Sequence, residues 1–132
     1  APLSPNWGYN HRDVSLRIPV SGNGDRRVEH RVAGADANPY LVMAALMAGV
    51  HHGLVERCDP GEMIPEGAEM EEVITLPRLW PQSLDVFDAA KVLPKYLGVE
   101  YCRLFGTVRR GECEQFYTQV SNIEYNWYLR SM

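Results

Sequence analysis

The feature that most limits the possible folds of this chain is a pair of alternating segments on either side of a turn. Apolar and polar side chains alternate over residues 14–20 and again over residues 26–32, after the turn sequence Ser-Gly-Asn-Gly-Asp. Successive side chains of a strand point to opposite faces of a sheet, so alternation of this kind predicts two strands. Glycine and asparagine between the segments favour a tight reversal of the chain. We therefore predict an antiparallel β-hairpin over about residues 13–32.

One face of this predicted hairpin carries mostly charged side chains. The residues on this face are Arg17, Arg27, Glu29 and Arg31, with Arg12 at its entrance. Guanidinium groups form paired hydrogen bonds with phosphates and carboxylates, and a carboxylate among them suits a metal ion. The cluster therefore indicates a site for a polyphosphate and a cation. A solvated outer face is the common alternative for alternating charge, although such a face usually includes lysine as well as arginine.

Residues 38–57 have the spacing of a helix with one apolar face. Asn38 is a suitable N-cap, and Pro39 suits the first turn. The apolar positions that recur at helical spacing are Tyr40, Met43, Ala44, Met47, Val50 and Leu54. A stripe of this kind predicts a helix that covers another element of the structure.

The second half of the chain is expected to be mainly helical. Ser83 is the predicted N-cap of a helix that Pro94 interrupts, and a longer helix is predicted over about residues 99–120. Residues 123–129 are rich in aromatic side chains, so we expect them to dock on this domain or on a neighbouring subunit. Together these patterns predict the α+β class, with an antiparallel hairpin followed by helices.

The composition excludes several classes of protein. A net charge of -4 over 132 residues argues against a general nucleic-acid binder. The longest apolar run, around residues 40–50, is too short to span a bilayer, so no membrane partner is expected. The 3 cysteines are scattered and form no Cys-x-x-Cys pair, which indicates reduced thiols and a cytoplasmic location.

The order of motifs between residues 7 and 53 resembles the carboxyl-terminal part of a glutamine synthetase catalytic domain. The matching motifs are Asn-His-Arg, Arg-Ile-Pro, Arg-Arg-Val-Glu-His-Arg and Ala-Asn-Pro-Tyr-Leu. The extended variant Arg-Arg-Val-Glu-His-Arg-Val-Ala-Gly-Ala-Asp is most similar to the γ-glutamylpolyamine (γ-glutamylputrescine) synthetase branch, and looser similarity continues to the end of the chain. Members of this family are several times longer. The resemblance therefore implies that residues 1–132 are a single carboxyl-terminal fragment of such a catalytic domain, inactive by itself.

The resemblance implies an ATP-dependent ligase. Enzymes of this family transfer the terminal phosphoryl group of ATP to the γ-carboxylate of glutamate, and an amine then displaces phosphate. The implied cofactors are ATP and Mg²⁺ (or Mn²⁺), the implied substrates are glutamate and a di- or polyamine, and a homo-oligomer is expected. Two alternatives stay open: a fragment of an ammonia-using glutamine synthetase, and a non-catalytic structural relative.

The resemblance also implies roles for single residues. Arg12 and Arg17 match arginines that contact the nucleotide phosphates, and Arg12 would also stabilise the phosphoryl group during transfer. Arg27 matches a further nucleotide-side arginine. Glu29 matches a ligand of the metal that bridges the ATP phosphates, and Arg31 matches the arginine that holds the glutamate carboxylate.

Two departures from the family pattern bear on the substrate and on the site. Glutamine-forming enzymes usually carry Phe-Pro-Asp where this chain has Val32-Ala33-Gly34, which favours an amine other than ammonia. Asp13 stands beside Arg12 in place of the familiar serine, and its role is open. The resemblance further implies that the other metal ligands lie upstream of this sequence.

Overall fold

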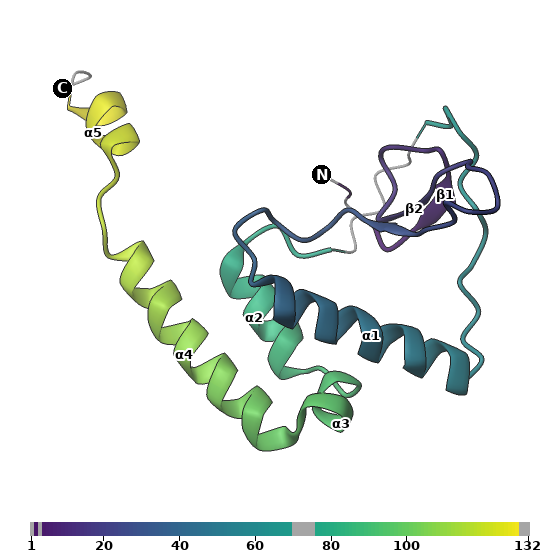
Figure 1. The fold of residues 1–132 in the computed structure, drawn as a ribbon. Coiled ribbons are helices and arrows are strands. Elements are labelled where there is room, and N and C mark those ends of the chain that lie inside the picture. The colour runs from purple at the N-terminus through teal and green to yellow at the C-terminus, as the bar shows by residue number, and fades with distance from the viewer. Residues whose placement is uncertain (1, 3, 70–75, 130–132) are drawn as a thin grey trace. The chain divides into compact units, whose positions relative to one another are not determined.

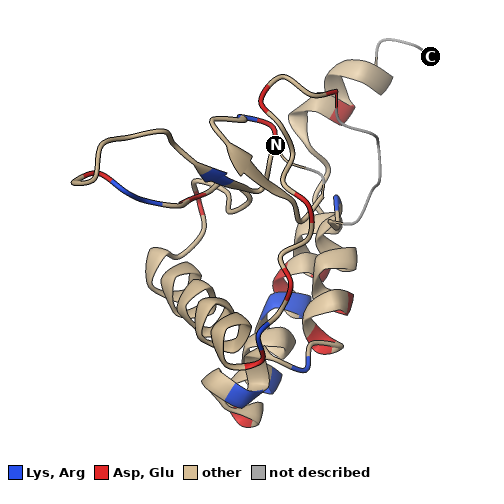
Figure 2. Cartoon of the chain, turned by 90° about the vertical axis from the view of Figure 1, so that its right-hand side faces the viewer, with Lys and Arg blue, Asp and Glu red and all other residues tan. Residues whose placement is uncertain are grey.

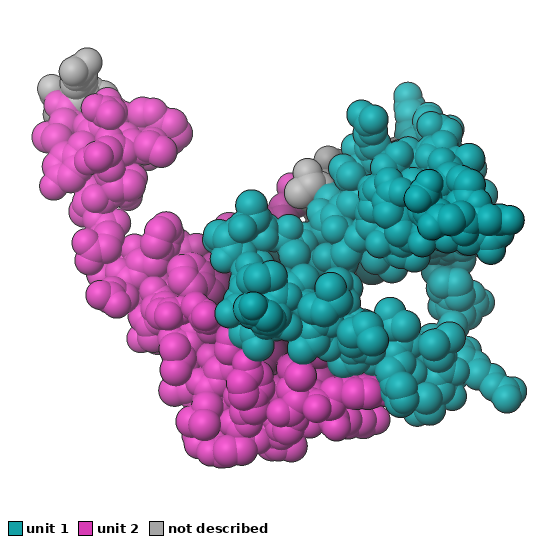
Figure 3. Space-filling view, in the orientation of Figure 1, with its two compact units in different colours: residues 1–77 teal, residues 78–132 magenta. Residues whose placement is uncertain are grey.

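The computed structural model describes residues 2, 4–69 and 76–129. Its strands are β1 (Trp7–Tyr9), β2 (Leu16–Ile18) and β3 (Glu29–His30), and its helices are α1 (Pro39–Val55), α2 (Trp80–Asp88), α3 (Leu93–Leu97), α4 (Val99–Tyr117) and α5 (Asn122–Tyr128) (Figure 1). A small sheet followed by helices confirms the predicted α+β class. The chain divides into two compact units, residues 1–77 and 78–132 (Figure 3). The single domain expected over residues 1–132 stays a prediction.

The three strands form one mixed sheet in the order β1-β2-β3. β2 and β3 are antiparallel, with Leu16 opposite His30 and Arg17 opposite Glu29, as the predicted hairpin requires. The paired strands are nevertheless shorter than the predicted range, since β2 has 3 residues and β3 has 2. β1 lies parallel to β2, with Gly8 opposite Arg17. Because β1 has only 3 residues, its sequence shows no alternation from which this pairing could be predicted.

The core of the first unit includes the connection between β1 and β2. Val14 is fully buried there, and His11 and Ser15 are only 4% exposed. The backbone N–H of Ser15 donates to Oδ1 of Asn6 at 3.0 Å, and its hydroxyl donates to the carbonyl of Ser4. Buried polar groups are tolerated when they are hydrogen-bonded, and these two bonds give Ser15, buried within the loop, its partners.

The apolar face predicted for the hairpin is largely exposed. Leu16 is 40% exposed, Val28 is 62% exposed and Val20 is 72% exposed. Among the described residues of the first unit, no helix makes packing contacts with the strands, which is the physical reason for this exposure.

α1 begins as predicted. Oδ1 of Asn38 accepts hydrogen bonds from the N–H groups of Tyr40 at 3.0 Å and Leu41 at 3.3 Å, and Pro39 lies in the first turn. These bonds satisfy donors that the helix itself leaves unpaired. The helix is 17 residues long, close to the predicted length.

The apolar stripe of α1 is exposed to solvent in this chain. Tyr40 is 84% exposed, Met47 is 62% exposed and Leu54 is 75% exposed, whereas Ala48 is buried. The helix contains no Asp, Glu, Lys or Arg, and it is therefore drawn entirely in tan in Figure 2. The covering role predicted from its spacing stays a prediction.

The predicted start of α2 at Ser83 is wrong. Ser83 lies inside the helix, and its hydroxyl donates to the carbonyl of Leu79 at 3.3 Å. Leu79 is the N-cap, and its N–H donates to Oε1 of Gln82 at 3.4 Å. Pro81 falls in the first turn, where its missing N–H has no helical partner to lose, so the helix can begin before the proline.

α4 is the central helix of the second unit and contacts both α2 and α3. Gly106 permits a close approach, because a Cβ atom there would lie 2.8 Å from Oδ1 of Asp88. The rings of Phe87 and Phe105 pack at 5.3 Å between centroids, and Arg110 pairs with Asp88 across the same contact. Among the described residues of this unit, the buried apolar side chains are Leu84, Cys102 and Cys113.

α5 begins with a capping box. The N–H of Ser121 donates to Oε2 of Glu124 at 2.7 Å, and the N–H of Glu124 donates back to Oγ of Ser121 at 3.2 Å. Its aromatic side chains are exposed, with Tyr125 at 52% and Trp127 at 68%, so the docking expected of this tail stays a prediction. None of the described helices is long and apolar enough to cross a membrane. All three cysteines are free thiols, and Cys58 is the exposed one.

Candidate functional site

Three of the five predicted site residues meet on one face of the β2–β3 pair. Arg17 lies opposite Glu29, and its NH1 group donates to Glu29 Oε2 at 2.8 Å. Arg27 approaches from the turn, and its Nε group donates to Glu29 Oε1 at 3.2 Å. The shared charged face expected from alternation is thus observed for these three residues, while their roles stay predictions.

The pKa of Glu29 is lowered below its ordinary value. The largest cause is the hydrogen bond from Arg17, and burial, the next largest, opposes it. The charge of Arg17, the hydrogen bond from Arg27 and the charge of Arg27 lower the pKa further. The carboxylate is therefore ionised at neutral pH, which is the form that arginine pairing and metal coordination both require. The pair is partly shielded from solvent, since the side chains of Arg17 and Glu29 are 19% and 28% exposed.

Glu29 by itself does not make a metal site. Both of its oxygens already accept from arginines, although each carboxylate oxygen has room for a further partner. Within residues 2, 4–69 and 76–129, no group of three or more His, Cys, Asp or Glu residues could hold a metal ion. A metal ion at Glu29 would therefore need ligands beyond those that the described residues bring together.

Arg17 holds a spare hydrogen-bond donor. Its Nε atom is buried and has no hydrogen-bond partner among the described residues. Leaving a guanidinium N–H buried and unpaired costs free energy, so such groups call for an explanation in a native site. The residues present therefore fit an additional anionic oxygen near Arg17, as the phosphates of a nucleotide would supply.

Arg12 lies beside Arg17 in a hollow of about 510 Å³, which we call the Arg12 hollow. It is lined by residues 10–13, Arg17 and residues 66–68. Arg12 is exposed, and in the part of the chain that the structure describes it forms no ion pair. Asp13 lines the same hollow, so an acid does stand close to the arginine.

Arg31 stands apart from the other four predicted residues. Its backbone N–H donates to the carbonyl of Ser15 at 2.9 Å, which extends the β2–β3 ladder by one bond. Its side chain is exposed, and among the described residues it pairs with no acid. The structure therefore places Arg31 on the same hairpin but does not bring it into contact with Glu29 or Arg12.

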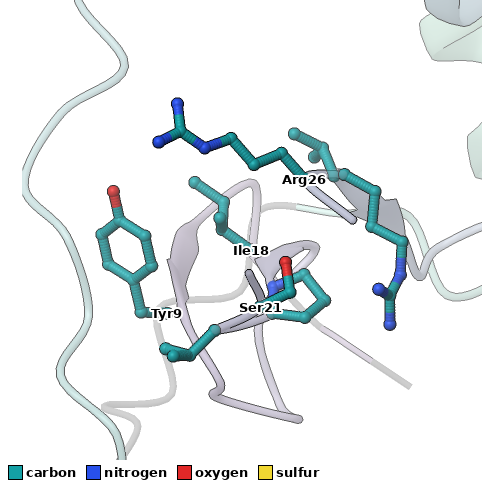
Figure 4. Close-up of a pocket in the computed structure, with 8 residues that line it drawn as sticks. Tyr9, Ile18, Ser21 and Arg26 are labelled. Atoms are coloured by element: carbon teal, nitrogen blue, oxygen red, sulfur yellow. The ribbon is translucent and has the colours of Figure 1, made fainter. Parts of the chain in front are cut away.

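A second hollow was missed by reasoning from the sequence. It measures about 610 Å³, and Figure 4 shows Tyr9, Ile18, Ser21 and Arg26 around it. Tyr9 reaches this hollow because β1 pairs with β2, which sets Tyr9 opposite Ile18, and the local sequence gives no signal of that pairing. An apolar surface with guanidinium groups at its edge suits a planar group that carries an anion.

Comparisons with known proteins agree with the motifs. Residues 1–128 match the family model described as glutamine synthetase, catalytic domain. The γ-glutamylputrescine synthetase PuuA of Escherichia coli (strain K12) is 38% identical over 98% of this chain and 28% of its own length. Type-1 glutamine synthetase 2 of Dictyostelium discoideum is 34% identical over 98% of this chain and 26% of its own length.

A solved structure agrees as well. GmaS in its apo form without ligand superposes with a TM-score of 0.77 and 28% sequence identity, covering 98% of this chain and 30% of that one. The chain belongs to the glutamine synthetase catalytic-domain family, as its motifs predicted. It spans only 26 to 28% of the length of the two curated relatives named above.

Proposed function

We propose that the protein to which this chain belongs is an ATP-dependent ligase that joins the γ-carboxylate of glutamate to an amine through γ-glutamyl phosphate. The observation that carries this proposal is the contact of Arg17 and Arg27 with Glu29 beside the Arg12 hollow, in a chain of the glutamine synthetase family. A structural relative has no need to keep these four residues together. We further propose that the chain is the carboxyl-terminal part of the catalytic domain.

The proposed roles follow from the charges of the side chains. Bound ATP supplies the phosphoryl group, with Mg²⁺ or Mn²⁺ as the metal. Arg12 and Arg17 bind the phosphates, and Arg27 binds the nucleotide close to Glu29, with which it already pairs. Glu29 contributes one carboxylate to the metal. Fixed positive groups of this kind neutralise charge on a transferring phosphoryl group without reorganising during the reaction.

Arg31 is proposed to bind the carboxylate of glutamate. Its planar guanidinium group can form two parallel hydrogen bonds with a carboxylate, and its exposed, unpaired state in the described chain leaves both donors available. In the full-length protein, Arg31→Ala should therefore raise the KM for glutamate while leaving the KM for ATP nearly unchanged.

The amine is proposed to be a di- or polyamine. The support is the 38% identity to a γ-glutamylputrescine synthetase and the Val32-Ala33-Gly34 departure from the glutamine-forming pattern. Relatives are named for different amide products. One of them, the γ-glutamylethanolamide synthetase GlnA4 of Streptomyces coelicolor, is 28% identical over 98% of this chain. Ammonia is therefore the alternative that an experiment has to exclude.

The full-length protein tests the proposal directly. It would be incubated with ATP, Mg²⁺ and glutamate, and with ammonia, ethanolamine, putrescine or spermidine in turn. Phosphate release would be measured, and mass spectrometry would identify the γ-glutamyl amide. We expect the highest kcat/KM with putrescine or a longer polyamine. Release of phosphate that depends on no amine would contradict the ligase proposal, and a preference for ammonia would contradict the polyamine proposal.

We also propose that the full-length protein is a homo-oligomer and that the 132-residue chain alone is inactive. The described residues bring together no group of three possible metal ligands, so a complete metal site would need further residues. Product formed by the isolated chain in the same assay would contradict this expectation.

A further inference from the structure

His11 is buried where its own loop meets a segment that is far away in the sequence. Its side chain is 4% exposed, and it belongs to the loop of residues 10–13 that carries Arg12. On its other side runs the segment of residues 61–68, which we call the strap. His11 and the strap are both walls of the Arg12 hollow, so any movement of either one changes the surroundings of Arg12.

The strap is held along β1 before it reaches His11. Nε1 of Trp7 donates to the carbonyl of Gly61 at 3.0 Å, and the N–H of Ile64 donates to the carbonyl of Trp7 at 2.9 Å. Gly8 is needed for this approach, because a Cβ atom there would clash with the carbonyl oxygen of Ile64. The far end of the strap is fixed by His11, whose Nε2 atom lies 3.2 Å from the carbonyl oxygen of Ala68.

The two partners of His11 determine where its proton lies. The N–H of Asp13 donates to Nδ1 at 3.2 Å, so Nδ1 must present a lone pair. The carbonyl of Ala68 can only accept, so Nε2 must carry the proton and donate. Both bonds are satisfied only by the neutral tautomer with its proton on Nε2. By accepting the hydrogen bond from Nε2, the carbonyl of Ala68 favours the tautomer in which Nδ1 has a lone pair and can accept the hydrogen bond from the N–H of Asp13.

The bond between Asp13 and His11 closes a turn around Arg12. The residue before this turn is also constrained, since Asn10 has a φ of 52° and its N–H donates to the carbonyl of Ile18 at 3.1 Å. The backbone on both sides of Arg12 is therefore held by hydrogen bonds, while its guanidinium group, which forms no ion pair among the described residues, can meet an anion.

We infer that His11 is a positioning residue for Arg12: the strap carbonyl of Ala68 fixes its tautomer, and its Nδ1 atom then closes the turn that presents Arg12 to the phosphoryl group. This inference rests on the proposed ligase function, because the effect on Arg12 is read in turnover. His11 touches no reacting atom. Its effect is the preorganisation of a group that acts in the transition state.

Three variants of the full-length protein separate the two bonds. His11→Ala removes both. His11→Asn offers an oxygen near the Nδ1 position and can restore the bond from Asp13, whereas His11→Gln offers an amide N–H near the Nε2 position and can restore only the bond to Ala68. We expect His11→Ala to lower kcat about tenfold, with a smaller change in KM for ATP. A tenfold change corresponds to the loss of one neutral hydrogen bond, here the bond from Asp13 that closes the turn around Arg12. His11→Asn should recover most of kcat, and His11→Gln should not.

Amide hydrogen exchange provides the complementary measurement. His11→Ala and His11→Asn should raise exchange in peptides that cover residues 61–69, while His11→Gln should keep the protection of the parent protein. The control is Lys95→Ala, which removes an exposed side chain of α3 and should change neither kcat nor exchange in the strap.

A double-mutant cycle with Arg12→Ala distinguishes positioning from a general loss of stability. If His11 acts through Arg12, adding His11→Ala to Arg12→Ala should lower kcat by less than about twofold further. Two independent losses that multiply would overturn the inference, and so would recovery of kcat by His11→Gln but not by His11→Asn. If His11→Ala fails to fold, the comparison of His11→Asn with His11→Gln still decides the outcome.

A full-length protein without ligase activity would overturn the proposed function and the inference together. An active protein in which the two losses of kcat multiply would overturn the inference alone.

Discussion

The loop of residues 10–15 and helix α1 are opposites within the first unit. The loop has no regular structure, yet Val14 is fully buried in it and His11 and Ser15 are 4% exposed. α1 is a regular helix of 17 residues, yet Tyr40 and Leu54 on its apolar stripe are 84% and 75% exposed. Regular structure and burial are therefore separate properties here. The loop is held by hydrogen bonds from within the unit, whereas α1 has the surface of a buried helix without a described element that covers it in this unit.

The largest expected effect comes from the loop. Arg12→Ala in the full-length protein should lower kcat by about a hundredfold to a thousandfold, or roughly 3 to 4 kcal/mol, because the group acts on charge that develops during transfer. Steady-state kinetics with ATP and glutamate varied would measure it. Arg103→Ala, which removes a surface arginine of α4, is the control and should leave kcat unchanged. Unchanged kcat with raised Michaelis constants for Arg12→Ala would show that Arg12 binds substrate only.

The next effect is on stability and tests whether the loop is a true core. Val14→Ala should lower the free energy of unfolding by about 2 kcal/mol, since it removes two methyl groups from a fully buried site. Urea denaturation of the full-length protein would measure it. Val20→Ala is the matched control, because Val20 is 72% exposed and should cost far less. Equal losses for the two valines would mean that the loop is no more buried than the outer face of the hairpin.

A smaller effect concerns charge, which the hairpin has and α1 lacks. The lowered pKa of Glu29 means that its pairing with Arg17 stabilises the folded state above the ordinary value of 4.5, and that this stability is lost as pH falls through the lower folded-state pKa. Glu29→Gln should therefore reduce the loss of stability between neutral pH and about pH 3. Urea denaturation at several pH values would show this. An identical pH dependence for the variant would mean that the ion pair is absent in solution.

The smallest expected effect is on α1. Met47 is 62% exposed, so in the 132-residue chain Met47→Ala should change the free energy of unfolding by less than about 0.5 kcal/mol. The result should differ in the full-length protein, because the helical spacing of α1 predicts that its apolar stripe is covered by another element there. We expect the same substitution to cost about 2 kcal/mol or more there. A small loss in both proteins would mean that α1 is exposed in the full-length protein too.

Much of the hairpin could be predicted because its signals are local. Alternation alone places Arg17 and Glu29 on one face, and the antiparallel register then sets them opposite each other. The start of α1 is also local, since Asn38 and Pro39 cap the turn they precede. The same reasoning failed at Ser83, because a serine followed by an apolar run resembles a cap even when Pro81 allows the helix to begin earlier.

His11 and the strap could not be predicted because their signals are not local. His11 is 57 residues from Ala68, and nothing in the spacing of residues 61–68 indicates that they run beside β1. Gly8 gave no signal either, although its missing side chain is what allows the carbonyl of Ile64 to approach.

The sequence by itself determined the family, the α+β class, the hairpin with its charged face and the capped helix, because each depends on residues within a few positions of one another. Only the tertiary structure decided that β1 pairs with β2, that the buried part of the first unit includes an irregular loop, and that Arg12 and the strap line one hollow. Those features arise when segments distant in the chain form hydrogen bonds with each other and exclude water. The free energy of such contacts depends on both segments together, so no single stretch of sequence predicts it.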